Sequence, residues 1–320
     1  MHAWEELVER CAEKRSRSLG GLSDAAFLEL ETAVRANPER YVDDDAEAAF
    51  LEVARALDRV TESMADDDLR DDDDYMAERA RRNARLADDC RRALTLDAGC
   101  VDAQVLLALA TKTDDAMLDA VGAAMADGGA TGPDADELAR WDDPFARPRI
   151  RATEVMSRLL LQTGRIGAAR DLCGRLVDAD PSDPTGARYT LALAHARMED
   201  EDALDALDAR YARRGNAWFH LARTLLLFKL DRAASGGRAL DGYCSLCEGG
   251  AFALLRPTFI EAYLPDRPDF APHGFTEATL AVHEADPLIV DAPDFANWAG
   301  ARPDVTEQAM AYAESQGLDW

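Results

Sequence analysis

Residues 150–183 read IRATEVMSRLLLQTGRIGAARDLCGRLVDADPSD, and this stretch contains the clearest helical unit of the sequence. Its first half repeats apolar side chains at helical spacing, and Gly164-Arg165 then interrupts the pattern. A second helical pattern follows and stops at Asp180-Pro181, because proline cannot continue a helix and disfavours helical geometry in the residue before it. Two helices, a glycine turn and a closing Asp-Pro within roughly 34 residues are typical of a tetratricopeptide unit.

Two more helix pairs follow this unit up to Leu230. The second is expected to begin at Asp183-Pro184, with Asp183 as the N-cap and Pro184 at the first helical position. The third begins near Gly215 and carries Trp218 at the aromatic position of the repeat. We therefore predict an all-α fold: a tetratricopeptide-like α-α superhelix (solenoid) with irregular N-terminal helices and a C-terminal helical cap.

The flanking segments also carry helical patterns. Amphipathic helices are expected in residues 1–20, after the capping residue Ser23, and from Asp45, while residues 66–74 form an acidic run. The predicted divisions are 1–74 (N-terminal helices and acidic loop), 75–143 (repeat-like segment) and 144–320 (repeats and cap). One continuous solenoid is the alternative.

Capping signals define two further helices. Pro133 is expected to start a helix that runs through Trp141. Near the C-terminus, Asp304 and Glu307 match a capping box for a helix over residues 305–315.

The composition narrows the class of protein. A formal net charge of −26 makes nucleic acid and anionic membranes poor partners. Arginine supplies almost all of the 36 basic residues, since the only lysines are Lys14, Lys112 and Lys229. The charged N-terminus lacks a signal-peptide pattern, and no apolar run approaches about 20 residues. With six scattered cysteines, this predicts reduced thiols and a cytoplasmic location without a membrane partner.

Several blocks of the middle third resemble the suppression of tumorigenicity protein family. They are Trp141, residues 147–152 (RPRIRA), residues 164–169 (GRIGAA), the junction at 180–189 (DPSDPTGARY) and residues 217–219 (AWF) followed by Phe228. The resemblance covers about residues 141–270. It implies helical, tetratricopeptide-like repeats and no established enzymatic activity. Animal members of that family carry membrane segments, and we do not extend this property to the present sequence.

The repeat register also predicts a binding surface. The first helix of each pair lines the concave face of such a stack. Applied here, the register gives the groove residues Arg151, Arg158, Arg188, Tyr189, His195, Asn216, His220 and Arg223. Because guanidinium groups bind carboxylates in a bidentate way, we expect a non-enzymatic scaffold whose partner is a protein or peptide with an acidic segment or a C-terminal carboxylate. The alternative is that these arginines pair with the chain's own Asp and Glu side chains.

Enzymatic and metal-dependent functions have weaker sequence signals. The acidic run lacks the spacing, glycine and terminal glutamate of a calcium loop. Cys244-x-x-Cys247 has no second ligand pair, so core cysteines are expected there. His273, Glu277 and His283 do not share a helical face. We therefore predict no metal, no cofactor and no catalytic residue. The rival is a hydrolase or metal-dependent enzyme with a site near His195 and His220.

Overall fold

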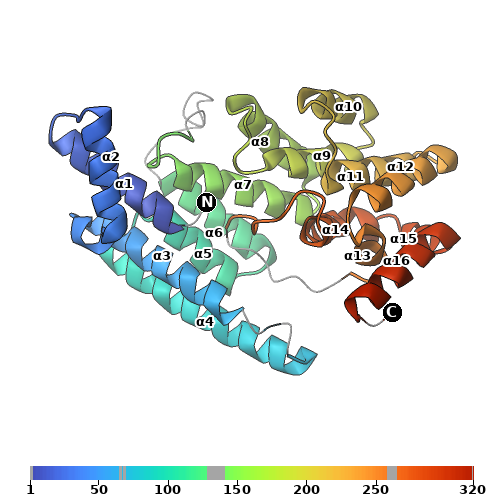
Figure 1. The fold of residues 1–320 in the computed structure, drawn as a ribbon, viewed down its shortest axis with the longest axis horizontal. Coiled ribbons are helices and arrows are strands. Elements are labelled where there is room, and N and C mark those ends of the chain that lie inside the picture. Colours follow the sequence, from blue (N-terminus) through green and yellow to red (C-terminus); the bar gives the residue numbers. More distant parts are fainter. Residues whose placement is uncertain (1–2, 65–66, 68–69, 128–140, 258–264, 319) are drawn as a thin grey trace. The chain divides into compact units, whose positions relative to one another are not determined.

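The computed structural model describes residues 3–64, 67, 70–127, 141–257, 265–318 and 320. All regular secondary structure in these ranges is helical, which confirms the predicted all-α class (Figure 1). The chain divides into unit 1, Met1–Met156 with Leu264–Asp266, and unit 2, Ser157–Tyr263 with Arg267–Trp320. This boundary falls inside α7 (Arg147–Gln162). The divisions expected at residues 74 and 143 stay predictions. The helix expected from Pro133 and part of the acidic run lie outside the described residues.

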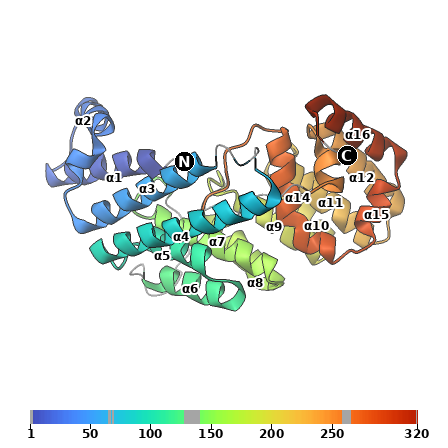
Figure 2. The same ribbon diagram turned by 90° about the horizontal axis from the view of Figure 1, so that it is seen from below.

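Unit 1 is a set of helices around one apolar core. Its elements are α1 (Ala3–Ser18), α2 (Asp24–Ala36), the 3₁₀ helix η1 (Pro38–Tyr41), α3 (Asp45–Ser63), α4 (Asp72–Leu96), α5 (Val101–Thr111) and α6 (Asp114–Asp127). The long helices α3 and α4 lie alongside each other (Figure 2). Ser23 caps α2 as predicted, because its hydroxyl accepts a hydrogen bond from the Ala26 amide. Leu7, Phe50 and Leu86 are almost fully buried in the shared core.

Unit 2 contains the end of α7 as well as the second helix of the first predicted pair, the two later pairs and the C-terminal helices. Its further elements are α8 (Ile166–Ala179), α9 (Ala187–Arg197), α10 (Glu201–Arg210), α11 (Ala217–Lys229), α12 (Ala233–Leu246), α13 (Gly250–Leu255), α14 (Phe275–Val290), α15 (Phe295–Gly300) and α16 (Pro303–Gln316). Helix α9 packs against α8, α10 and α11, and α11 packs against α12 and α14. Trp218 and Leu225 of α11 are fully buried, so α11 is the centre of this unit.

One turn occurs three times between the helices of successive pairs. Gly164, Glu199 and Asp231 each have a positive φ, of 77°, 60° and 56°. In each turn this residue's N–H donates to the carbonyl three residues earlier, and the next N–H donates to the carbonyl five residues before it. This is the 6→1 bond of a Schellman motif, in which a left-handed residue ends the helix. The turns between α7 and α8, α9 and α10, and α11 and α12 therefore have the same local geometry.

Two predicted helix starts are wrong. Helix α9 begins at Ala187 with Gly186 as its N-cap, and Asp183 has a positive φ of 53° instead of a capping conformation. The Asp183 carboxylate still reaches this helix end, where it accepts a hydrogen bond from the Arg188 amide at 3.3 Å. Helix α16 begins at Pro303 with Arg302 as N-cap, so the Asp304–Glu307 capping box does not form.

No helix in the described ranges combines the length and the apolar character that a membrane crossing requires.

Candidate functional site

Arg151, the first predicted groove residue, is a buried member of a charge cluster in unit 1. Its guanidinium binds both Glu6 of α1 and Asp102 of α5, and Glu6 also pairs with Arg10 at 2.6 Å. Burial raises the pKa of Asp102. It also opposes ionisation of Glu6, but Arg151 and Arg10 outweigh it and lower the pKa of Glu6. Two cations and two carboxylates thus satisfy one another, so Arg151 acts as a structural cation.

Arg188 and Tyr189 lie at the start of α9 in a second internal cluster. The Arg188 guanidinium lies 4.7 Å from the ring centroids of both Tyr189 and Tyr211, and it pairs with Asp183 at 3.6 Å. Tyr189 stacks on Trp218, with centroids 4.3 Å apart, and is 9% exposed. Burial raises the pKa of Asp183 to about 6, although Arg188 opposes that rise. These contacts hold the junction between α8 and α9.

The predicted groove residues of α11 also have partners within the chain. Asn216 is the N-cap of α11, because its side-chain oxygen accepts a hydrogen bond from the Phe219 amide at 3.0 Å. Arg223 pairs with Asp205 at 2.5 Å and with Asp208 at 3.3 Å on α10. Together with Arg151 and Arg188, Arg223 follows the alternative in which groove arginines bind the chain's own carboxylates.

The two histidines of the rival enzyme hypothesis have different surroundings. Burial lowers the pKa of His195, and the charges acting on it are those of Asp200 and Arg170. Burial also lowers the pKa of His220, which lies near Asp208, Arg223, His273 and Glu277. The two sets share no residue. Within the described residues, no three His, Cys, Asp or Glu side chains are placed to hold a metal ion.

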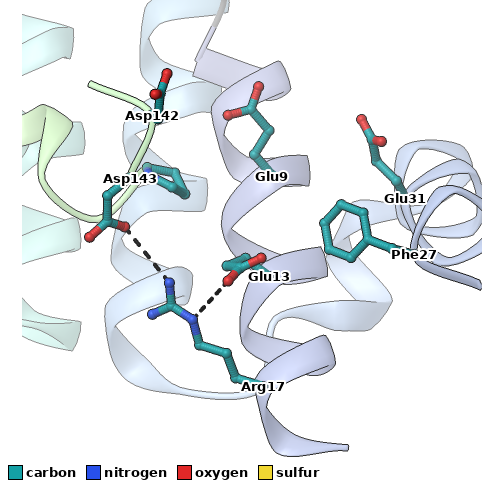
Figure 3. A pocket seen from close by; sticks show the side chains of 8 residues that line it. Glu9, Glu13, Arg17, Phe27, Glu31, Asp142 and Asp143 are labelled. Atoms are coloured by element: carbon teal, nitrogen blue, oxygen red, sulfur yellow. Dashed lines mark hydrogen bonds and ion pairs between the residues drawn. The ribbon is translucent and has the colours of Figure 1, made fainter. Parts of the chain in front are cut away.

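An acidic pocket opens on unit 1 between α1, α2 and the segment before α7 (Figure 3). Its volume is about 670 Å³, and its lining is Glu9, Glu13, Arg17, Phe27, Glu31, Asp142, Asp143 and Pro144. Arg17 is the single cation among these residues, and it pairs with Glu13 at 2.9 Å and with Asp143 at 4.0 Å. The carboxylates of this pocket give it a negative field, which attracts cations. On a chain with a net charge of −26, however, an acidic surface is the expected case.

The second pocket lies in unit 2 and has a different character. Helices α8, α9 and α10 line an open space of about 650 Å³, here called the α8–α10 groove. Its cationic groups are Arg170 and Arg175 of α8 and Arg210 of α10, and His195 of α9 adds an imidazole. The only carboxylates among its described lining residues are Asp171 and Asp178. Of the eight predicted groove residues, His195 alone is among them.

The arginines of the groove have weak internal partners, or none among the described residues. Arg170 pairs with its neighbour Asp171 and Arg210 pairs with Asp178, and both aspartates are more than half exposed. Exposed ion pairs contribute only about 0–1 kcal/mol, so an incoming carboxylate can replace the internal one at little cost. Within the part of the chain that the structure describes, Arg175 has no ion-pair or hydrogen-bond partner. The groove therefore presents unused positive charge.

Sequence reasoning missed Arg170, Arg175 and Arg210 because it placed the surface on the first helix of each pair. These three arginines lie on the second helices. Arg158, the remaining predicted residue, is buried at 8% exposure and does not line the groove. The sequence signal that could have located this groove is the presence of three arginines on the second helices of two adjacent pairs.

Comparison of the whole chain with protein-family models, with curated proteins and with solved structures finds no match.

Proposed function

We propose that this protein is a non-enzymatic, tetratricopeptide-like scaffold that binds an acidic protein segment in the α8–α10 groove. The observation that carries the proposal is that Arg175 has no partner among the described residues and shares the groove with two weakly paired arginines, on a chain of net charge −26. Charge-assisted hydrogen bonds from guanidinium to carboxylate are among the strongest that proteins form.

The repeat architecture is supported by local geometry. Within the helix pairs the same left-handed turn recurs at residues 164, 199 and 231, at spacings close to the ~34-residue period of tetratricopeptide units. The same turn also ends helices at Gly20, Ala212 and Gly317, so the support comes from the spacing and not from the turn itself. Each pair then contributes one wall of a groove, as stacked repeats do. The family proposal, a resemblance to the suppression of tumorigenicity proteins over about residues 141–270, depends on the sequence blocks given above.

The binding surface proposed now differs from the one expected from the sequence register. On the first-helix face, Arg151, Arg188 and Arg223 already bind carboxylates of the chain. A partner must displace buried or multiply bonded groups there. In the α8–α10 groove the carboxylates that pair with Arg170 and Arg210 are exposed, and Arg175 has no partner among the described residues, so the groove is the better site.

The test is fluorescence anisotropy with labelled synthetic peptides of about 18 residues that combine Glu, Asp and Leu. Arg175→Glu should weaken binding by about 10- to 100-fold, because a hydrogen bond to a charged group contributes about 1.5–3 kcal/mol. Arg214→Glu is the matched control: Arg214 is exposed, lies outside the groove lining and changes the net charge equally.

Two outcomes would contradict the proposal. One is the absence of binding by any acidic peptide up to about 1 mM, which corresponds to a binding free energy weaker than about −4 kcal/mol. The other is loss of binding in Arg188→Glu/Arg223→Glu with full binding in Arg175→Glu. That pattern would return the site to the first-helix face.

A further inference from the structure

The α8–α10 groove has the form of a trough. Helix α9 packs against both α8 and α10, and it supplies Leu191 and His195, one helical turn apart, as lining residues. Ala203, Ala206 and Leu207 of α10 line it at helical spacings of three and four residues. Gly174 and Val177 line it from α8 at the same spacing of three. One face of each of the three helices therefore borders the same space.

Small side chains leave room for a ligand backbone between these helices. A Cβ added at Gly174 would meet no atom within 4 Å, so the space above α8 is open there. On α10, the side chains that face the groove include the small residues Ala203 and Ala206, and Ala206 is exposed. Packed helices have axes about 8–10 Å apart, and small side chains at the contact favour the shorter distances. A further helix can therefore approach α8 and α10 closely.

The backbone of the groove favours a helical ligand over an extended one. One way in which an extended peptide binds is by adding a strand to a sheet edge, which supplies main-chain hydrogen bonds. The groove is lined by residues of α8, α9 and α10, whose backbone groups bond within their own helices. An extended ligand would find no free main-chain partner in these helices, whereas a helical ligand satisfies its own N–H and C=O groups internally.

The polar groups of the groove define the charge of the ligand. Arg170 and Arg175 line the groove from α8 and Arg210 lines it from α10, and the apolar residues Leu191 of α9 and Leu207 of α10 line the same space. Arg210 also donates a hydrogen bond to the Val177 carbonyl at 2.7 Å, and this bond links the C-terminal ends of α8 and α10. The complementary ligand has an apolar stripe with carboxylates on both sides of it.

We propose that the occupant of the α8–α10 groove is an amphipathic α-helix of a partner protein, with an apolar stripe flanked by Asp and Glu. This inference rests on the proposed function, since it specifies the conformation and pattern of the acidic segment. The helix binds with its stripe over Leu191 and Ala206, and its flanking carboxylates pair with Arg170, Arg175 and Arg210.

The experiment uses the full chain and three labelled peptides of about 18 residues, a length at which an isolated helix can form. The first has Leu at helical spacing with flanking Glu, the second has two central residues replaced by proline, and the third has the same composition with the Leu positions shuffled. The first should bind and gain helical circular dichroism on binding. The other two should bind at least tenfold more weakly.

Matched variants of α10 locate the binding surface. Ala206→Trp fills the groove and should weaken binding of the first peptide at least tenfold. Ala209→Trp places the same side chain at another exposed alanine of α10 that does not line the groove, and it should bind like the wild type.

The outcomes separate the two proposals. Equal binding of the helical and proline peptides would overturn the helical occupant and leave the acidic-segment proposal standing. Equal effects of the two tryptophan variants would overturn the groove as the docking surface. Failure of all three peptides to bind would overturn both.

Discussion

Replacing Arg267 with methionine should be among the most destabilising single changes in unit 2. Its guanidinium binds both oxygens of Glu284, at 2.7 and 3.1 Å, and also the Thr185 and Gly186 carbonyls and the Thr190 hydroxyl. The side chains of Arg267 and Glu284 are 6% and 4% exposed. Glu284 also accepts a hydrogen bond from the Trp218 indole at 2.8 Å. One buried cation thus connects α14 to the start of α9 and to α11.

The expected loss follows from this burial. Removing one partner of a buried pair leaves an uncompensated charge and costs about 3–5 kcal/mol. The double variant Arg267→Met/Glu284→Gln removes both charges and retains an acceptor for Trp218. It should therefore lose about 1–3 kcal/mol less than the sum of the two single variants.

Urea unfolding followed by tryptophan fluorescence measures these differences. A second probe such as circular dichroism should be recorded as well, since a chain with two units need not unfold in one step. A loss below about 1 kcal/mol for Arg267→Met, or strict additivity in the double variant, would refute the argument that this pair is a buried and coupled charge network.

Three smaller predictions concern turns, pH and a buried hydroxyl. Residues 164 and 231 both have a positive φ, a backbone conformation that L side chains disfavour. Asp231→Gly should therefore stabilise the chain and Gly164→Ala should destabilise it, each by about 1 kcal/mol in urea unfolding. The Asp183 carboxyl has its pKa raised to about 6, against about 3.9 unfolded, so it contributes stability at pH 4 that is lost as the pH rises to 6. Stability curves at several pH values should therefore show that loss in the wild type and a smaller one in Asp183→Asn. Tyr243→Phe should leave the stability of the chain unchanged or raise it slightly, because the buried Tyr243 hydroxyl has no hydrogen-bond partner among the described residues. A loss above about 1 kcal/mol in urea unfolding would reveal such a partner.

The helices of unit 2 were largely predictable because their signals are local. Helical spacing, the turn at Gly164 and the stop at Asp180-Pro181 all depend on residues within a few positions of one another. The start of α9 was not predictable in this way. Asp183 and Pro184 match an N-cap pattern, but Gly186 can adopt a left-handed φ of 71° and becomes the cap instead.

The candidate site was harder to predict because charge pairing is a long-range property. Arg151 is separated from its partners Glu6 and Asp102 by 145 and 49 positions. A repeat register can place an arginine on a helix face, but it cannot show which carboxylates the fold brings to it. Arg175 is available for the opposite reason, since the fold brings no carboxylate within range of it among the described residues.

Photo-crosslinking can locate the bound peptide on the chain. The helical acidic peptide would carry a diazirine on its apolar stripe, and mass spectrometry would locate the adducts after irradiation with the full chain. We expect adducts within residues 166–179, 187–197 and 201–210, the helices that line the groove. Adducts confined to α11 near Arg223, or to the acidic pocket of unit 1, would contradict this expectation.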